Sequence, residues 1–330
     1  MKQYKKNIIL IALIIVLSLY VILHKKDRTN YKLPDIPDIS EKNITKLEIA
    51  AITSSIILKK KAGNWYIEPE NYLADNNKVN RMLGTLKDIK VTALVSQLKN
   101  YNLYDLNDEK KITIKAWNKE DLKRMVEIGK TASYYRHTFI KLEKDGPVYH
   151  AAGDFRSSFD LTKNNLRDKL VLSFKKDEIR SINIHKGSAN IALALKDLES
   201  ELKPMEDKEE KNKAQKEEVE HKPTAKVWKT TDDKICVKSK VDELLGKLSK
   251  LECKQYINNK NKDDFKNPVF IIELKGTKEK KLLIFPMQRK DATEYPCISS
   301  TTEYPFFLTK GQAENIMIDF KEIVETKVEK

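Results

Sequence analysis

Two stretches of the chain carry the same helical spacing of apolar side chains. Both follow the spacing of one buried face of an α-helix, and both place a glycine directly after the third apolar residue. The two sets are Val79, Met82, Leu83, Leu86 and Ile89, and Val241, Leu244, Leu245, Leu248 and Leu251. A tryptophan precedes each set, Trp65 in the first and Trp228 in the second. We therefore interpret the chain as a duplicated module with one amphipathic helix in each copy.

Short runs of alternating apolar and polar residues surround both helices and predict β-strands. In the first copy the runs begin near residues 44, 55, 65, 91, 112, 124 and 138, and in the second near 179, 191, 269 and 281. A third pair of similar segments, 159–163 and 306–310, extends the match between the copies. Further helices are expected over 161–169 and 310–324. The fold class predicted is α+β, in two tandem repeated modules of mostly antiparallel strands packed on one helix each, over residues 44–176 and 177–330.

The N-terminal region differs from the rest, because residues 8–23 contain no charge and lie between groups of lysines. We interpret residues 7–23 as a transmembrane signal anchor, residues 1–6 as a cytoplasmic head and residues 24–43 as an extended stalk. The competing interpretation is a cleaved signal peptide, which the absence of a small-x-small cleavage site disfavours. We expect the chain to lie in the cytoplasmic (inner) membrane, single-pass, with its bulk extracytoplasmic.

One stretch of the second module is too highly charged to form a core. Residues 199–223 are rich in glutamate and lysine and contain no aromatic residue, so we expect a mobile charged insertion there. The whole chain of 330 residues has a net charge of +14, with 40% apolar and 34% charged residues. Such a composition supports folded modules with a strongly solvated surface.

Cysteine and histidine give no sign of a metal or redox site. Three cysteines, with no C-x-x-C pair, leave the existence of a disulfide open, and Cys253 matches Val91 of the first copy, as an apolar filler would. We expect His137, His150 and His185 to be isolated on predicted strands or their ends. Each of the five histidines, which include His24 and His221, is expected to be a surface residue or a satisfied polar group.

No motif in the chain identifies a catalytic centre. Gly129-Lys130-Thr131 resembles the end of a phosphate-binding loop, but Arg124 stands where that loop needs glycine, so we interpret the tripeptide as a β-turn. Carboxylates are too numerous to select a pair, among them Glu68, Glu70, Asp75, Asp105 and Asp108. We nominate no catalytic, cofactor-binding or metal-ligating residue, expect no cofactor, and expect the chain not to be an enzyme.

Several short motifs follow one another along the first half of the chain: Trp65-Tyr66-Ile67-Glu68-Pro69, Ala74-Asp75, the helix from Val79 to Leu86, Tyr101-Asn102-Leu103-Tyr104-Asp105-Leu106-Asn107, Val126-Glu127-Ile128-Gly129 and Leu166-Arg167-Asp168-Lys169. Their order resembles the DUF4340 family of membrane-anchored bacterial proteins over about residues 1–185. Asn107 departs from the family pattern, which has aspartate there. The resemblance implies an auxiliary component of ABC-type transport systems of the kind linked to gliding motility.

From this resemblance and the anchor we expect a non-enzymatic accessory or scaffold protein of a cell-envelope transport complex. Its partners would be the membrane, through residues 7–23, and an integral-membrane permease and ATPase, with no nucleic acid. The alternative is an extracytoplasmic module that binds anionic lipid or a cell-wall polymer through its basic surface. A third interpretation is that the chain is an enzyme with an unrecognised active site.

Overall fold

The computed structural model describes residues 2–23, 31–52, 54–133, 136–197, 226–287, 289 and 291–324. The chain divides into two compact units, Met1–Arg167 and Asp168–Lys330. Each unit contains one large antiparallel sheet and one main helix, so the expected α+β class with mostly antiparallel strands is confirmed. The expected charged insertion, 199–223, lies outside the described residues.

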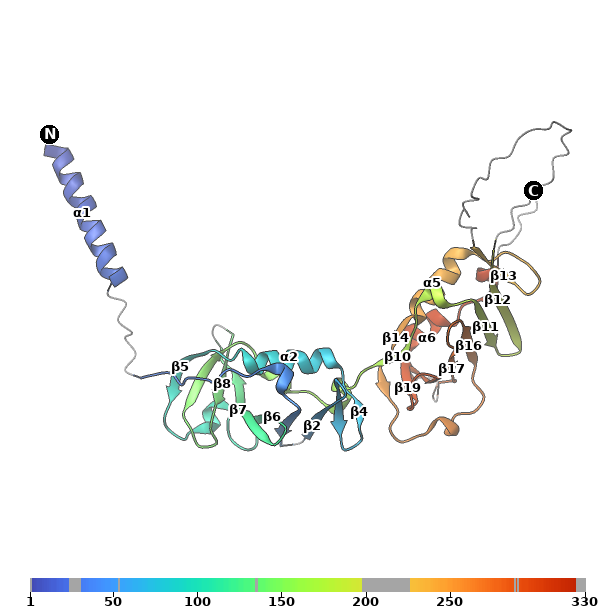
Figure 1. The fold of residues 1–330 in the computed structure, drawn as a ribbon, viewed down its shortest axis with the longest axis horizontal. Coiled ribbons are helices and arrows are strands. Elements are labelled where there is room, and N and C mark those ends of the chain that lie inside the picture. Colours follow the sequence, from blue (N-terminus) through green and yellow to red (C-terminus); the bar gives the residue numbers. More distant parts are fainter. Residues whose placement is uncertain are drawn as a thin grey trace, which may run out of the picture. The chain divides into compact units, whose positions relative to one another are not determined.

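The first unit is built on a nine-stranded sheet with the order β4-β3-β2-β1-β6-β7-β8-β9-β5 (Figure 1). Every pairing in this sheet is antiparallel. Its strands are β1 (Lys46–Ala51), β2 (Ser54–Lys61), β3 (Asn64–Glu68), β4 (Tyr72–Leu73), β5 (Val91–Ser96), β6 (Ile112–Asn118), β7 (Asp121–Thr131), β8 (His137–Lys141) and β9 (Val148–Ala152).

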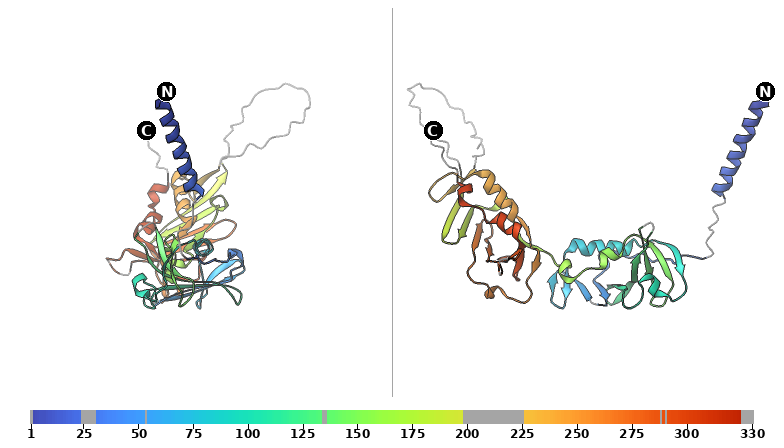
Figure 2. Two further views of the ribbon diagram at one scale, coloured as in Figure 1. Left: turned by 90° about the vertical axis from the view of Figure 1, so that its left-hand side faces the viewer. Right: turned by 180° about the vertical axis from the view of Figure 1, so that it is seen from behind.

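The helix α2 (Asn76–Lys87) covers one face of this sheet (Figures 1 and 2). Its first turn is capped by the Asp75 carboxylate, which accepts hydrogen bonds from the backbone N–H groups of Asn77 and Lys78. The helix buries the face that the sequence predicts, Val79, Met82, Leu83 and Leu86, in one core with the inward side chains of the strands. Burial of this stripe is the main source of stability for a helix of only twelve residues.

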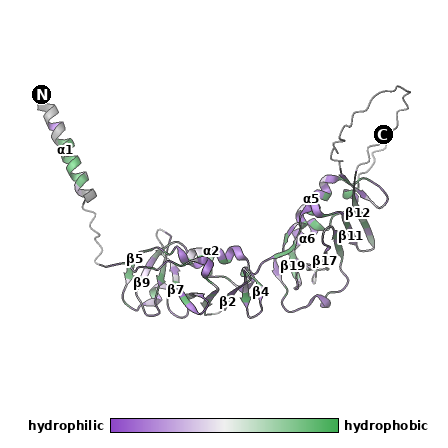
Figure 3. Ribbon diagram, in the orientation of Figure 1, coloured by the Kyte–Doolittle hydropathy of each residue, from purple (hydrophilic) through white to green (hydrophobic). Residues whose placement is uncertain are grey.

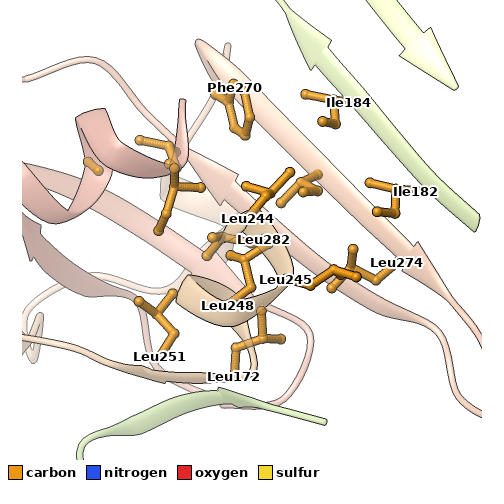
Figure 4. Packing of buried hydrophobic residues seen from close by; sticks show 14 of the residues in the cluster. Leu172, Ile182, Ile184, Leu244, Leu245, Leu248, Leu251, Phe270, Leu274 and Leu282 are labelled. Atoms are coloured by element: carbon orange, nitrogen blue, oxygen red, sulfur yellow. The ribbon is translucent and has the colours of Figure 1, made fainter. Parts of the chain in front are cut away.

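The second unit has an eight-stranded antiparallel sheet with the order β13-β12-β11-β16-β17-β18-β19-β15. Helix α5 (Lys238–Leu248) packs Leu244, Leu245 and Leu248 against this sheet (Figure 4). The strands are β11 (Ser181–Lys186), β12 (Ala189–Asp197), β13 (Lys226–Thr230), β15 (Gln255–Tyr256), β16 (Phe270–Lys275), β17 (Lys280–Ile284), β18 (Glu294–Ser299) and β19 (Phe306–Thr309). A separate pair joins β10 (Leu170–Ser173) to β14 (Lys250–Glu252).

The two sheets have the same strand order, apart from the short β4 that extends the first. Reading across each sheet, β3-β2-β1-β6-β7-β8-β9-β5 corresponds to β13-β12-β11-β16-β17-β18-β19-β15. The chain closes each unit in the same way, because the N–H of Asp75 donates to Leu166 O at 2.8 Å and that of Val237 to Ile323 O at 2.7 Å. The repetition that the helical spacing predicts therefore also holds for the strand topology of the two units.

Three sequence expectations about local structure are wrong. Segments 159–163 and 306–310 are not equivalent, since Phe159 ends the helix α3 (Arg156–Phe159), whereas Phe306 begins the strand β19. The single helix expected over 310–324 is two helices, α6 (Lys310–Ile316) and α7 (Phe320–Ile323), because the Asp319 side chain caps a new start. The short helix expected over 161–169 is only α4 (Lys163–Leu166), capped by Thr162.

The expected β-turn at Gly129-Lys130-Thr131 is also wrong, because β7 runs through all three residues. A Cβ atom at Gly129 would lie 2.1 Å from the carbonyl oxygen of Tyr104, which belongs to the 3-10 helix η2 (Tyr101–Tyr104). Glycine is therefore required there by the close approach of the η2 backbone to the sheet.

The N-terminal helix α1 (Lys2–Leu23) is hydrophobic over much of its length (Figure 3). Its apolar side chains are exposed, including Leu10 at 62% and Val16 at 66%. Within the described part of the chain, no helix combines the length and the apolar character that crossing a membrane requires. The transmembrane span expected over 7–23 is thus not supported by these residues.

The segment that precedes β1 is held against the first unit. Residues 32–40 form no helix or strand, yet Ile39 is buried in the core and Ile36 packs on it. The buried guanidinium of Arg124 donates hydrogen bonds to the carbonyl oxygens of Pro37 and, at 3.2 Å, Leu86. Part of the stretch 24–43, expected as a stalk, is therefore packed on the sheet.

The contact at Gly129 predicts opposite effects for two glycine substitutions. Gly129→Ala should lower the free energy of unfolding by about 1–3 kcal/mol, because the methyl group meets backbone atoms that cannot rotate away. Gly84→Ala in α2 meets no atom within 4 Å and should raise that free energy by about 0.5–1 kcal/mol. Urea unfolding of the full chain measures both, and a Gly129→Ala protein as stable as the wild type would contradict the close approach.

Candidate functional site

A cavity of about 510 Å³ lies in the first unit, next to η2. The residues that line it come from the segment 99–111 and from the end of β8 with the following turn: Lys99, Asn100, Tyr101, Asn102, Leu103, Leu106, Asn107, Asp108, Lys111, Lys141, Lys144 and Asp145. Core residues of the central strands, such as Ile112, Ile128 and Ile140, belong to the cluster that includes α2. Because side chains alternate along a strand, Lys111, Glu127 and Lys141 project from the opposite face, where the cavity lies.

Glu127 of β7 holds two lysine side chains at the base of this cavity. Its carboxylate oxygens lie 2.6 Å from Lys141 Nζ and 2.7 Å from Lys111 Nζ. The side chains of Glu127 and Lys141 are only 3% and 2% exposed, so this ion pair is removed from solvent. Lys111 also contacts the exposed Asp108 carboxylate at 2.6 Å.

These contacts stabilise the charged forms of the network. Burial alone would lower the pKa of Lys111, but its hydrogen bonds to Asp108 and Glu127 outweigh burial and raise the pKa above its ordinary value. The hydrogen bond from Lys111 also lowers the pKa of Asp108. Both pKa shifts favour the charged forms of Lys111 and Asp108.

Tyr101 covers the buried ammonium of Lys141. Lys141 Nζ lies 3.7 Å from the centre of the Tyr101 ring and donates a hydrogen bond of 2.6 Å to the carbonyl oxygen of Lys144. The Tyr101 hydroxyl donates to Gly146 O at 3.1 Å. Burial, followed by the charges of Asp145 and Glu127, raises the pKa of this hydroxyl. The buried pair thus fixes both η2 and the turn after β8, which form two walls of the cavity.

Two lysines and one amide lining the cavity have unused binding capacity. Among the described residues, neither Lys99 nor Lys144 forms an ion pair through its ammonium group. The Oδ1 atom of Asn107 is buried and has no hydrogen-bond partner in the described structure. Of these groups, the exposed ammonium groups of Lys99 and Lys144 are accessible to a molecule in the cavity, whereas the Asn107 oxygen is not.

An aromatic row lies on the same face of the sheet, beyond Tyr101. Ring centres are 4.9 Å apart for Tyr104 and Phe139, 4.7 Å for Phe139 and His150, and 5.7 Å for His150 and His137. The expectation that His137 and His150 are isolated is therefore wrong, because β8 and β9 are neighbours. Burial, followed by the charge of His137, lowers the pKa of His150, whose Nε2 is buried and has no partner in the described structure.

The other residues weighed in the sequence do not gather into a site. Of the five carboxylates considered, only Asp108 lines the cavity. Glu68, Glu70 and Asp105 pair with Lys61, Lys163 and Lys110, and Asp75 caps α2. Cys236, Cys253 and Cys297 are buried and form no disulfide with one another, and burial raises the pKa of Cys297. Over the described ranges, no group of three or more histidine, cysteine, aspartate or glutamate residues could hold a metal ion. His24 and His221 lie outside these ranges.

The second unit has apolar residues at the positions of the buried pair. Equivalent hairpins place Ile49 of β1 opposite Ile56 and Ile184 of β11 opposite Ile191. Following the register outward through β6 and β16 places Val126 in β7 at the position of Leu282 in β17. The next cross-strand pair is Glu127 with Lys141 in the first unit and Leu283 with Ile298 in the second. The sequence alone does not single out Glu127, Lys111 and Lys141 as site residues. Their only sign in the sequence is a charged residue next to buried apolar positions of the strands.

This equivalence predicts a non-additive effect on stability. Glu127→Leu or Lys141→Ile alone should lower the free energy of unfolding by about 3–5 kcal/mol, because each leaves a buried charge without its partner. The double variant should be close to the wild type, since Lys111 keeps Asp108 and the second unit packs the same apolar pair. A double-mutant cycle in urea measures the coupling, and additive losses would contradict the pairing.

The depressed pKa of His150 predicts a loss of stability in acid. The unfolded side chain titrates at about 6.5, above the folded value, so the unfolded state binds the proton more readily. The stability from neutral His150 is complete above the unfolded pKa and is lost as the pH falls through it toward the folded pKa. His150→Gln should reduce the fall in melting temperature between about pH 7 and 5. His185→Gln in β11 is the control, and an unchanged slope in His150→Gln would refute the assignment.

The comparisons with known proteins give a family but no function. The model of a domain of unknown function, DUF4340, matches residues 65–268, which begin in β3 of the first unit and end just before β16 of the second. The match thus extends past residue 185, where the expected range of about 1–185 ends, but it does not include residues 1–64 of that range. No curated protein and no solved structure matches the chain. With the larger part of its length covered by this match, the chain belongs to the DUF4340 family.

Proposed function

We propose that the chain is a non-enzymatic accessory or scaffold protein of a cell-envelope transport complex of the ABC type. It would be attached to the cytoplasmic membrane through its N-terminal helix, with both α+β units extracytoplasmic. The observation that carries this proposal is the long helix α1, none of whose described side chains belongs to the buried core of a unit.

An exposed apolar helix needs another apolar environment. Leu10, Leu13, Val16 and Leu17 are each more than half exposed. Burying one such side chain contributes about 1.5–3 kcal/mol, so the helix as a whole gains substantially from entering a membrane. Lys2, Lys5 and Lys6 precede this stretch and suit the interface with anionic headgroups.

The two units support a scaffold role through their repetition. Each is a complete sheet-and-helix module with its own core, so each offers a separate docking surface. Cross-linking in intact membranes followed by mass spectrometry of the full-length protein tests the partner. Recovery of a permease and an ATPase is the expected result, and recovery of the protein alone would overturn the accessory role.

Attachment through α1 predicts a specific loss of membrane binding. The double variant Leu13→Lys/Val16→Lys should move the full-length protein from the membrane fraction to the soluble fraction, because two charges in the apolar stretch oppose burial. Ile52→Lys, at a 67% exposed site in the first unit, is the matched control and should stay in the membrane fraction. Continued sedimentation of the double variant after alkaline washing would reject attachment through α1.

The second candidate function is a module that binds anionic lipid or a cell-wall polymer. The net charge of +14 favours it, because the long-range attraction of a basic surface for such polymers is general. Binding of the full chain to anionic vesicles or wall fragments that weakens steeply with added salt would favour this function. Salt-insensitive co-purification with a permease would favour the accessory role.

A further inference from the structure

We propose that the cavity beside η2 is a binding site for a small anionic molecule that also carries hydroxyl groups, such as a sugar acid or a sugar phosphate. The site belongs to the first unit alone. This inference does not depend on the accessory role or on membrane attachment.

The charge of the lining favours an anion. Four lysines line the cavity, Lys99, Lys111, Lys141 and Lys144, against the two carboxylates of Asp108 and Asp145. Asp108 and the underlying Glu127 are occupied by Lys111 and Lys141. Among the described residues this leaves two lysines without an ion pair, Lys99 and Lys144, against one such carboxylate, Asp145. A carboxylate or phosphate in the cavity would form charge-assisted hydrogen bonds with these ammonium groups.

A hydroxylated ligand suits the rest of the lining. The exposed side-chain amides of Asn100 and Asn102 line the cavity and can donate hydrogen bonds to ligand hydroxyls and accept from them. The half-buried ring of Tyr101 and the exposed side chain of Leu103 also line the cavity and provide an apolar wall for a sugar ring. The volume of about 510 Å³ falls within the range of small-molecule sites.

The second unit provides an internal comparison that argues against a purely structural role for the charges. The same fold is built there with Leu283 and Ile298 in place of Glu127 and Lys141, and with Val269 preceding β16 where Lys111 precedes β6. A buried ion pair is commonly no more stabilising than an apolar pair of similar size. The module therefore does not require the charges for folding, and in the first unit they hold Tyr101 and the Lys144 turn in place around the cavity. Glu127 and Lys141 act as positioning residues, and Lys99 and Lys144 as the ligand contacts.

The test is a titration of the full-length protein with three probes that share one ring: glucuronate, glucose 6-phosphate and glucose. Binding is followed by calorimetry at two salt concentrations. We expect at least one charged probe to bind saturably, with an affinity that falls as salt is added. The affinity for glucose should be weaker by a factor of about ten or more. Preference between the two charged probes distinguishes a carboxylate ligand from a phosphate ligand. No binding of either charged probe, or equal binding of glucose, would overturn the proposal.

Three variants locate the site. Lys99→Gln/Lys144→Gln should lower affinity for the charged probe about tenfold and abolish its advantage over glucose. Lys275→Gln/Lys278→Gln removes the same charge from exposed positions of the second unit and should bind as the wild type does. Glu127→Leu/Lys141→Ile copies the second unit and should lose binding while circular dichroism and melting temperature remain those of a folded protein. Full binding by this folded variant, or by Lys99→Gln/Lys144→Gln, would place the ligand elsewhere and refute the assignment.

Discussion

Each unit depends on one packing arrangement, the burial of an amphipathic helix on one face of an antiparallel sheet. The helix is too short to be stable alone, and a wide sheet without cover would expose its apolar face to water. The arrangement is locked by the chain itself, because the residue before each helix bonds to a short helix at the end of the same unit. In the first unit this contact joins Asp75 to Leu166, and in the second it joins Val237 to Ile323. The C-terminal end of each unit therefore meets the start of its main helix.

With one face committed to the helix, variation between the units is concentrated on the other face. In the first unit that face carries charged residues and aromatic rings, covered by η2. Buried charges are retained only when they are paired, and Glu127 serves two lysines at once. The equivalent positions of the second unit are apolar. A duplicated fold has therefore kept its core and changed the chemistry of its second surface.

The sequence was sufficient for features with a local cause. The spacing of Val79, Met82, Leu83 and Leu86 predicts α2, and Asp75 predicts its cap, because both effects act within one turn of helix. The sequence was insufficient where contacts between segments far apart in the chain determine the structure. Similar residue types at 159–163 and 306–310 suggested a repeat. In the structure, however, the first segment begins at the end of the helix α3, whereas the second begins with the strand β19. The cavity was missed for the same reason: lysine and glutamate are abundant, and only the register of β7 with β8 places Glu127 opposite Lys141.

The attachment of residues 36–39 to the first unit has a mechanical consequence. Any pull on the chain from the side of α1 reaches the sheet first through the Arg124 hydrogen bond to Pro37 and the buried side chain of Ile39. Arg124 lies in β7, and its second hydrogen bond goes to Leu86 at the end of α2. Tension is thereby shared between the central sheet and the covering helix before it reaches β1. The N-terminal segment is therefore joined to the first unit through contacts with both the sheet and the helix α2, and not only through the end of the strand β1.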